Sequence, residues 1–140
     1  LFVNPVLAGL YNAKTFTLKN GLQVYVIENH RTPAVTQIVV YKVGSANDPR
    51  GKSGIAHFME HMMFKGPKDA ASAQIIDAVE QVGGAINAAT SYDYTYYYEV
   101  VPTEHLETVM RLEAARMDKL EALPDQINSE IKVVLEEESM

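Results

Sequence analysis

Apolar and polar positions along this 140-residue chain first follow a strand-like pattern. The segments Thr15–Leu18 and Leu22–Glu28 flank the turn-forming pair Asn20-Gly21, and together they predict a β-hairpin. The β-branched run Ala34–Gly44 predicts a buried strand. Turn-forming residues follow, among them Asp48-Pro49. The first part of the chain is therefore predicted to consist of strands.

The apolar spacing then becomes helical. A first helix is predicted to begin near Ser53 and to end at Gly66-Pro67. A second helix is predicted over 70–82, where Gly83-Gly84 ends it. The remaining predicted elements are two strands, near 85–89 and 94–101, and two helices, opened by Pro102-Thr103 and by Pro124. Strands followed by mixed helices and strands predict an α+β sandwich.

Composition narrows the class of protein. With 47% hydrophobic residues the chain can build the core of one domain, or of part of one. The net charge of −6 argues against nucleic-acid binding. No apolar run reaches the 18 or so residues of a membrane span. The absence of cysteine excludes disulfides, thiolate metal ligands and a cysteine nucleophile.

The first residues, LFVNPVLAGLYNA, are apolar and include the small residues Ala8 and Ala13. Cleavage sites of secretory signals favour small residues, so this segment fits the tail of a cleaved signal. It fits an ordinary N-terminal extension equally well.

Candidate chemistry lies in the first predicted helix, in the stretch GIAHFMEHMMFKGP. Residues four apart on a helix lie above one another, so His57 and His61 are expected to point the same way. Two imidazoles at this spacing can hold one metal ion. Glu60 is too close to His61 for a third ligand, but it can act as a general base on water held by the metal. HxxEH inverts the order of the HExxH zinc motif.

The pattern also fits a purely structural helix with two satisfied histidines and a surface glutamate. A catalytic zinc site normally has three protein ligands, so a third ligand is needed. Without cysteine it must be histidine, aspartate or glutamate. His30 and His105 are both expected to be surface residues.

The fourth predicted helix offers carboxylates for this position. Its apolar residues span one broad arc at about 100° per residue, and Glu130 and Glu137 fall inside the arc. A carboxylate on an apolar face is costly unless it is paired or bound to metal. Glu138 also falls inside, so geometry does not choose between Glu137 and Glu138. Alternatively, the helix end frays and these carboxylates are solvated.

The sequence resembles the inverted-zincin metallopeptidases, the family of pitrilysin, insulin-degrading enzyme and mitochondrial processing peptidase. It is most similar to the bacterial and processing-peptidase branch, over about 14–140. The stretches that carry the resemblance are GIAHFMEHMMFKGP, LKNGLQVYV, YKVGSANDPRGKSGIAH, GGAINAATSYDYTYYYEVVP and EIKVVLEEE. The resemblance implies a two-layer α+β fold, a mainly antiparallel sheet with helices packed on one side.

Functional residues follow from this resemblance by position. The two histidine ligands of Zn²⁺ would be His57 and His61, and the general base Glu60. The distal glutamate ligand, about 76 residues after the second histidine, would be Glu137. A further glutamate seven residues earlier, Glu130, would orient a ligand or the water.

The resemblance also implies how substrate is held and what completes the enzyme. Asn87 and Ala88, in a substrate-binding edge strand, would bind an extended peptide by β-augmentation. A second, homologous domain or partner subunit would close the chamber. Residues 1–140 are therefore expected to be a partial N-terminal zinc-binding catalytic domain that binds zinc but cleaves poorly alone. Glu138 stands where the family often has an apolar residue.

The expected function is zinc-dependent hydrolysis of peptide bonds in extended peptides or presequences. A non-catalytic subunit of a two-subunit metallopeptidase is the main alternative, although such members typically lose motif residues that are present here. A small-molecule enzyme resembling S-ribosylhomocysteine lyase also uses HxxEH, but it relies on cysteine. The periplasm is the expected compartment, with the mitochondrial matrix as the alternative.

Overall fold

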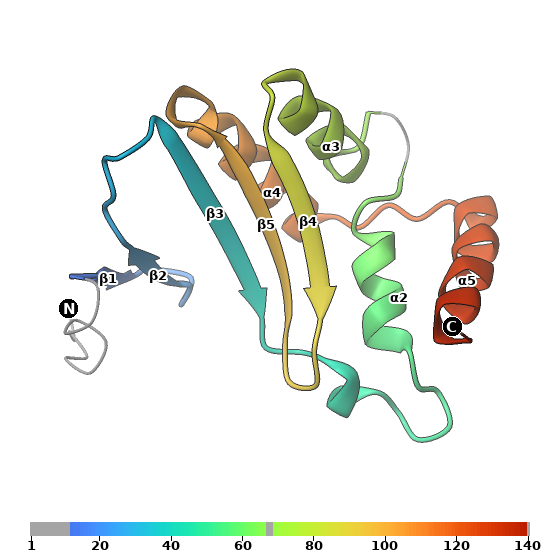
Figure 1. Ribbon diagram of the computed structural model, residues 1–140. Coiled ribbons are helices and arrows are strands. Elements are labelled where there is room, and N and C mark those ends of the chain that lie inside the picture. The colour runs from blue at the N-terminus through green and yellow to red at the C-terminus, as the bar shows by residue number, and fades with distance from the viewer. Residues whose placement is uncertain (1–11, 67–68, 140) are drawn as a thin grey trace. The chain divides into compact units, whose positions relative to one another are not determined.

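The structure, a computed structural model, describes residues 12–66 and 69–139 (Figure 1). The chain forms two compact units, one up to Pro33 and one from Ala34 onward. Residues 1–11 of the apolar N-terminal segment that fits a signal tail lie outside the described residues, as does Pro67.

The first unit contains the predicted hairpin. Strands β1 (Lys14–Thr17) and β2 (Gln23–Val26) pair antiparallel, with Thr17 opposite Gln23. Gly21 has a φ of 90°, a left-handed conformation that glycine adopts without strain, and this explains the turn at Asn20-Gly21. β1 has the predicted four residues but begins and ends one residue earlier, and β2 is shorter than predicted at both ends. Leu18 and Leu22 belong to the connecting turn, where Leu18 N donates a hydrogen bond to Leu22 O at 2.9 Å.

A three-stranded antiparallel sheet organises the second unit, in the order β3-β5-β4 (Figure 1). Its strands are β3 (Ala34–Tyr41), β4 (Ala85–Thr90) and β5 (Thr95–Pro102). The helices are α2 (Ile55–Met62), α3 (Ala71–Gln81), α4 (Leu106–Asp118) and α5 (Pro124–Glu138), with 3-10 turns η1 (Ser45–Asn47) and η2 (Thr103–His105). The first helix is shorter than predicted at both ends, and η2 precedes the third.

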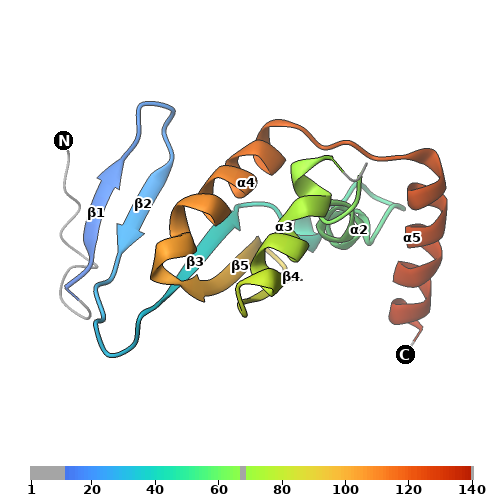
Figure 2. The same cartoon turned by 90° about the horizontal axis from the view of Figure 1, so that it is seen from above.

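The core lies on one face of this sheet. Every second residue of β5 is buried, and α3 and α4 pack side by side over that face (Figure 2). Four side chains form its centre: Ile75, Val79, Val101 and Val109. On the opposite face Ile38 and Val40 are exposed. The arrangement confirms the expected α+β fold with helices on one side of a mainly antiparallel sheet.

Charged residues also occupy this core, which the sequence analysis did not predict. Arg116 of α4 is buried and pairs with Glu113 on the same helix and with Glu99 of β5, at 3.8 Å to Glu99 Oε1. The guanidinium carbon lies 4.4 Å from the ring centre of Tyr97 and 5.0 Å from that of Phe64. One guanidinium thus serves two buried carboxylates.

Because two buried carboxylates share one guanidinium, the stability of the fold depends on pH. Burial and the neighbouring Glu113 raise the pKa of Glu99 from 4.5 to about 7, although Arg116 opposes the change. Burial raises the pKa of Glu113 as well. A carboxyl with a raised pKa keeps its proton in the folded chain where the unfolded chain has released it. The contribution of Glu99 to the stability of the fold is therefore complete below pH 4.5, and it is lost as the pH rises through about 7.

We therefore expect Glu99→Gln to flatten the pH dependence of stability. Between pH 5 and pH 8 the free energy of unfolding of the parent should fall by about 1–3 kcal/mol relative to the variant. Urea unfolding at both pH values, in the presence of chelator, measures this difference. An equal slope in parent and variant would show that Glu99 does not titrate in this range.

Candidate metal centre

Helix α2, which carries the histidines, is anchored at its N-terminus by Asp48. One carboxylate oxygen of Asp48 accepts a hydrogen bond from Gly54 N at 2.8 Å, and the other accepts one from Ala56 N at 2.9 Å. Both amides belong to the first turn, where backbone donors have no partner within the helix. Gly54 itself has a φ of 89°, which suits glycine. The loop before α2 therefore fixes where the helix starts.

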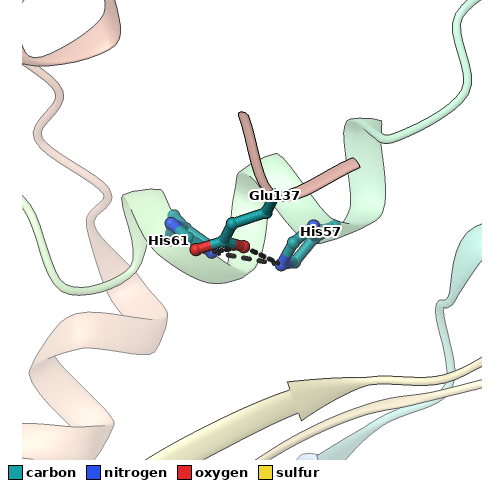
Figure 3. Close-up of side chains that lie close together, drawn as sticks. All are labelled: His57, His61 and Glu137. Atoms are coloured by element: carbon teal, nitrogen blue, oxygen red, sulfur yellow. Dashed lines mark hydrogen bonds and ion pairs between the residues drawn. The ribbon is translucent and has the colours of Figure 1, made fainter. Parts of the chain in front are cut away.

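His57 and His61 meet on one side of α2, and Glu137 of α5 reaches them from the neighbouring helix (Figure 3). The two Nε2 atoms are 3.1 Å apart. Glu137 Oε2 lies 3.4 Å from His57 Nε2 and 3.6 Å from His61 Nε2. Within the part of the chain that the structure describes, no other histidine, aspartate and glutamate side chains form such a group.

These separations fit a zinc ion. Zinc binds imidazole nitrogen and carboxylate oxygen at roughly 2.0–2.2 Å in tetrahedral sites, which requires ligand atoms about 3.3 Å apart. The three separations, 3.1, 3.4 and 3.6 Å, lie close to that value. Two nitrogens and one carboxylate oxygen are also a donor set found in catalytic zinc sites, where the fourth position stays open.

Glu130 settles the tautomer of His61. Glu130 Oε1 lies 2.8 Å from His61 Nδ1, and Glu130 Oε2 lies 2.9 Å from Lys65 Nζ. Burial alone would raise the pKa of Glu130, but the bonds from Lys65 and His61 outweigh it and lower the pKa. The ionised carboxylate only accepts, so His61 Nδ1 carries the hydrogen. In the neutral imidazole, Nε2 then presents its lone pair toward His57 and Glu137.

Glu60 lies beside this group and not in it. The hydroxyl of Thr90, at the end of β4, donates a hydrogen bond to Glu60 Oε2. Glu60 and His57 line the same open cleft of about 590 Å³, between α2, the loop before it and β4. The side chain is therefore placed to meet a small molecule or peptide group entering next to the histidines.

Asn87 and Ala88 lie on an edge strand, because β4 pairs with β5 alone among the described strands. Ala88 is on the sheet face that carries the core and lines the cleft. Asn87 is exposed on the opposite face, and its side-chain oxygen accepts a hydrogen bond from Ala88 N at 2.8 Å. The structure thus brings Ala88, but not the Asn87 side chain, to the cleft.

The predicted apolar arc of the last helix is only partly covered. Glu130 and Val134 of α5 are buried, whereas Ile131, Val133 and Leu135 are exposed. The side chain of Glu138 lies outside the described part of the structure.

Three residues of this site are not among those that the sequence predicted: Asp48, Lys65 and Thr90. In the sequence Asp48 has only the signal of a turn residue, because the amides that it caps lie six and eight positions later and not in its own turn. Lys65 lies three residues after the end of α2, so helical spacing does not predict its contact with Glu130. No local pattern connects Thr90 to Glu60, because their contact spans thirty residues.

Comparison with known proteins assigns the family. Residues 23–140 match the insulinase family, peptidase family M16, and the chain belongs to this family. "Zinc protease PqqE" of Helicobacter pylori is 39% identical over 125 residues, which are 89% of this chain and 28% of that protein. "Probable mitochondrial-processing peptidase subunit beta, mitochondrial" of Arabidopsis thaliana is 32% identical over 86% of this chain and 23% of that protein. The resemblance drawn from the sequence motifs is confirmed.

Solved structures agree with this assignment. A protease from Helicobacter pylori superposes with a TM-score of 0.83 at 39% identity, over 89% of this chain and 30% of its own. The periplasmic protease PqqL from Escherichia coli superposes with a TM-score of 0.80 at 30% identity, over 89% of this chain and 15% of its own. This chain therefore spans less than a third of the length of these relatives.

Proposed function

We propose that this chain forms the zinc-binding part of a metalloendopeptidase. The observation that carries the proposal is the convergence of His57 Nε2, His61 Nε2 and Glu137 Oε2 at separations that suit one zinc ion. Membership of a peptidase family whose relatives are named zinc proteases supports the same conclusion. Zinc, when bound, would lower the pKa of water and polarise a peptide carbonyl.

Each residue of the site has a distinct proposed role. His57, His61 and Glu137 hold the metal. Glu60 accepts a proton from the attacking water and passes it to the departing amine, as a general base and then a general acid. Glu130 fixes the orientation and tautomer of His61 through Nδ1, and Lys65 keeps Glu130 ionised.

The substrate that suits this site is an extended peptide. A strand with one unpaired edge can bind a peptide by main-chain hydrogen bonds, and among the described strands β4 presents such an edge next to the cleft. Ala88 faces the cleft. Asn87, whose side chain is exposed on the opposite face of β4, would contact the peptide from that face. Presequences and other unfolded segments fit this mode because they can adopt the strand conformation.

A second homologous domain or subunit is the proposed partner. It would enclose the substrate against the cleft, which is open in the part of the chain that the structure describes. One solved relative is "the first half of the periplasmic protease PqqL", which superposes on this chain with a TM-score of 0.79. A protease with a first half is built of two halves, which supports the proposal.

We propose a periplasmic or exported location, in line with the periplasmic relative. The mitochondrial relative supports the matrix as the alternative. Within the described residues, none of the helices is both long and apolar enough for a membrane crossing.

The test is peptide hydrolysis by the natural full-length protein with a fluorogenic library of unstructured peptides. We expect cleavage to stop with chelator and to return when zinc is added back, while a folded protein substrate stays intact. The non-catalytic alternative predicts no cleavage in any condition, even with zinc bound and in the presence of its partner half. That result would overturn the proposal.

A further inference from the structure

We propose that Thr90 is a positioning residue for Glu60. Its hydroxyl holds one carboxylate oxygen of Glu60, so that the other oxygen stays available to take a proton from water. The inference rests on the proposed role of Glu60 as general base, and it adds a residue from a different element to the machinery.

The register of the sheet places Thr90 for this contact. Thr90 is the last residue of β4 and stands opposite Thr95, the first residue of β5. Residues directly opposite in an antiparallel pair point to the same face, and this face lies toward α2. Ser91 N bonds to Tyr94 O at 2.8 Å and closes the turn between the strands. The sheet register and the turn thus fix the position of Thr90 next to α2.

Thr95 determines which way the Thr90 hydroxyl points. Thr95 is buried, and its hydroxyl donates to Val43 O at 2.9 Å. The two threonine oxygens are 3.2 Å apart. Because Thr95 has already given its single hydrogen to Val43, it can only accept from Thr90. The Thr90 hydrogen therefore has two acceptors, Thr95 Oγ1 and Glu60 Oε2, and the ionised carboxylate is the stronger one.

Fixing Oε2 restricts the end of the Glu60 side chain. The terminal torsion of glutamate is broad and nearly free, so an unheld carboxylate rotates. With Oε2 bound to Thr90, Oε1 makes no hydrogen bond within the described part of the chain, and the Glu60 side chain lines the open cleft. A general base must lie within hydrogen-bond reach of the proton it takes, and small misplacements cost large factors in rate. Thr90 thus supplies orientation without touching the reacting atoms.

Thr90→Val tests the hydroxyl alone, since valine has nearly the same shape and also suits a strand. It leaves no orphaned buried donor, because Thr95 keeps Val43 O as its acceptor. We expect kcat of the full-length protein to fall about 10- to 100-fold, with KM, zinc content and melting temperature unchanged. A crystal structure of T90V should show the Glu60 carboxylate turned from its parent position.

Thr90→Ser keeps the hydroxyl and should restore most of kcat. Thr36→Val, the same change on the exposed face of β3, is the matched control and should leave kcat unchanged. Equal loss in T90S and T90V, a change confined to KM, or loss of zinc in T90V would overturn the inference. Full activity in Glu60→Gln would overturn the proposed function and the inference together. Activity lost in Glu60→Gln but unchanged in T90V would overturn the inference on Thr90 alone.

Discussion

Glu60→Gln is expected to slow peptide hydrolysis by about 10²- to 10⁴-fold while leaving zinc in place. Glutamine has the same shape and still accepts the hydrogen bond from Thr90 through its carbonyl oxygen. It has no basic oxygen for the proton of water, so the proton-transfer contribution is lost. General acid–base catalysis contributes about 10²- to 10⁴-fold, and kcat should fall by a factor in that range. The ligands His57, His61 and Glu137 are untouched, so metal content should not change.

The measurement is kcat and KM on a fluorogenic peptide, with zinc determined on the same samples. Glu80→Gln, an exposed glutamate on α3, is the matched control for the loss of one negative charge. Hydrolysis at the parent rate in Glu60→Gln would contradict the assignment of Glu60. Loss of zinc along with activity would mean that Glu60 supports the metal and not the proton transfer.

Arg116→Met should cause a large loss of stability. Methionine fills a similar length between Tyr97 and Phe64, but it leaves Glu99 and Glu113 buried without a cation. Removing one partner of a buried ion pair costs about 3–5 kcal/mol, mainly through the uncompensated charge. The loss should be larger at pH 8 than at pH 5, because both carboxyls have raised pKa values and can protonate at the lower pH.

Chemical denaturation at both pH values checks this expectation. Arg111→Met, on the exposed side of the same helix, removes an ion pair with Glu107 four residues before it. Exposed pairs of this kind contribute about 0.3–0.5 kcal/mol, so this control should barely change stability. Replacing both glutamates by glutamine in Arg116→Met should recover much of the loss. No recovery would show that packing, and not charge, explains the effect of Arg116→Met.

The parts of the site that the sequence predicted depend on local spacing. His57, Glu60 and His61 follow from one helical turn, and the structure places both imidazoles on one side of α2. Glu137 needed the family resemblance, because periodicity left Glu138 as an equal candidate. Thr90 and Asp48 could not be predicted, since each contact depends on how a loop or strand packs against α2.

The core shows a different limit of sequence interpretation. The alternation along β5 already places Glu99 on the same face as Tyr97 and Val101, and helical spacing places Glu113 and Arg116 on the face of Val109. The pattern contained the signal for a buried ion cluster. Charged residues are rarely buried unless paired, so general rules of burial do not by themselves place these three in the core.

Zinc content of the purified chain tests the central claim most directly. Elemental analysis would compare the parent with Glu137→Gln and with Glu136→Gln, which removes the exposed neighbouring carboxylate on α5. We predict about one zinc per chain in the parent and in Glu136→Gln, and loss of zinc in Glu137→Gln and in His61→Ala. Zinc retained in Glu137→Gln, or no zinc in the parent even after metal is added back, would contradict the three-ligand site.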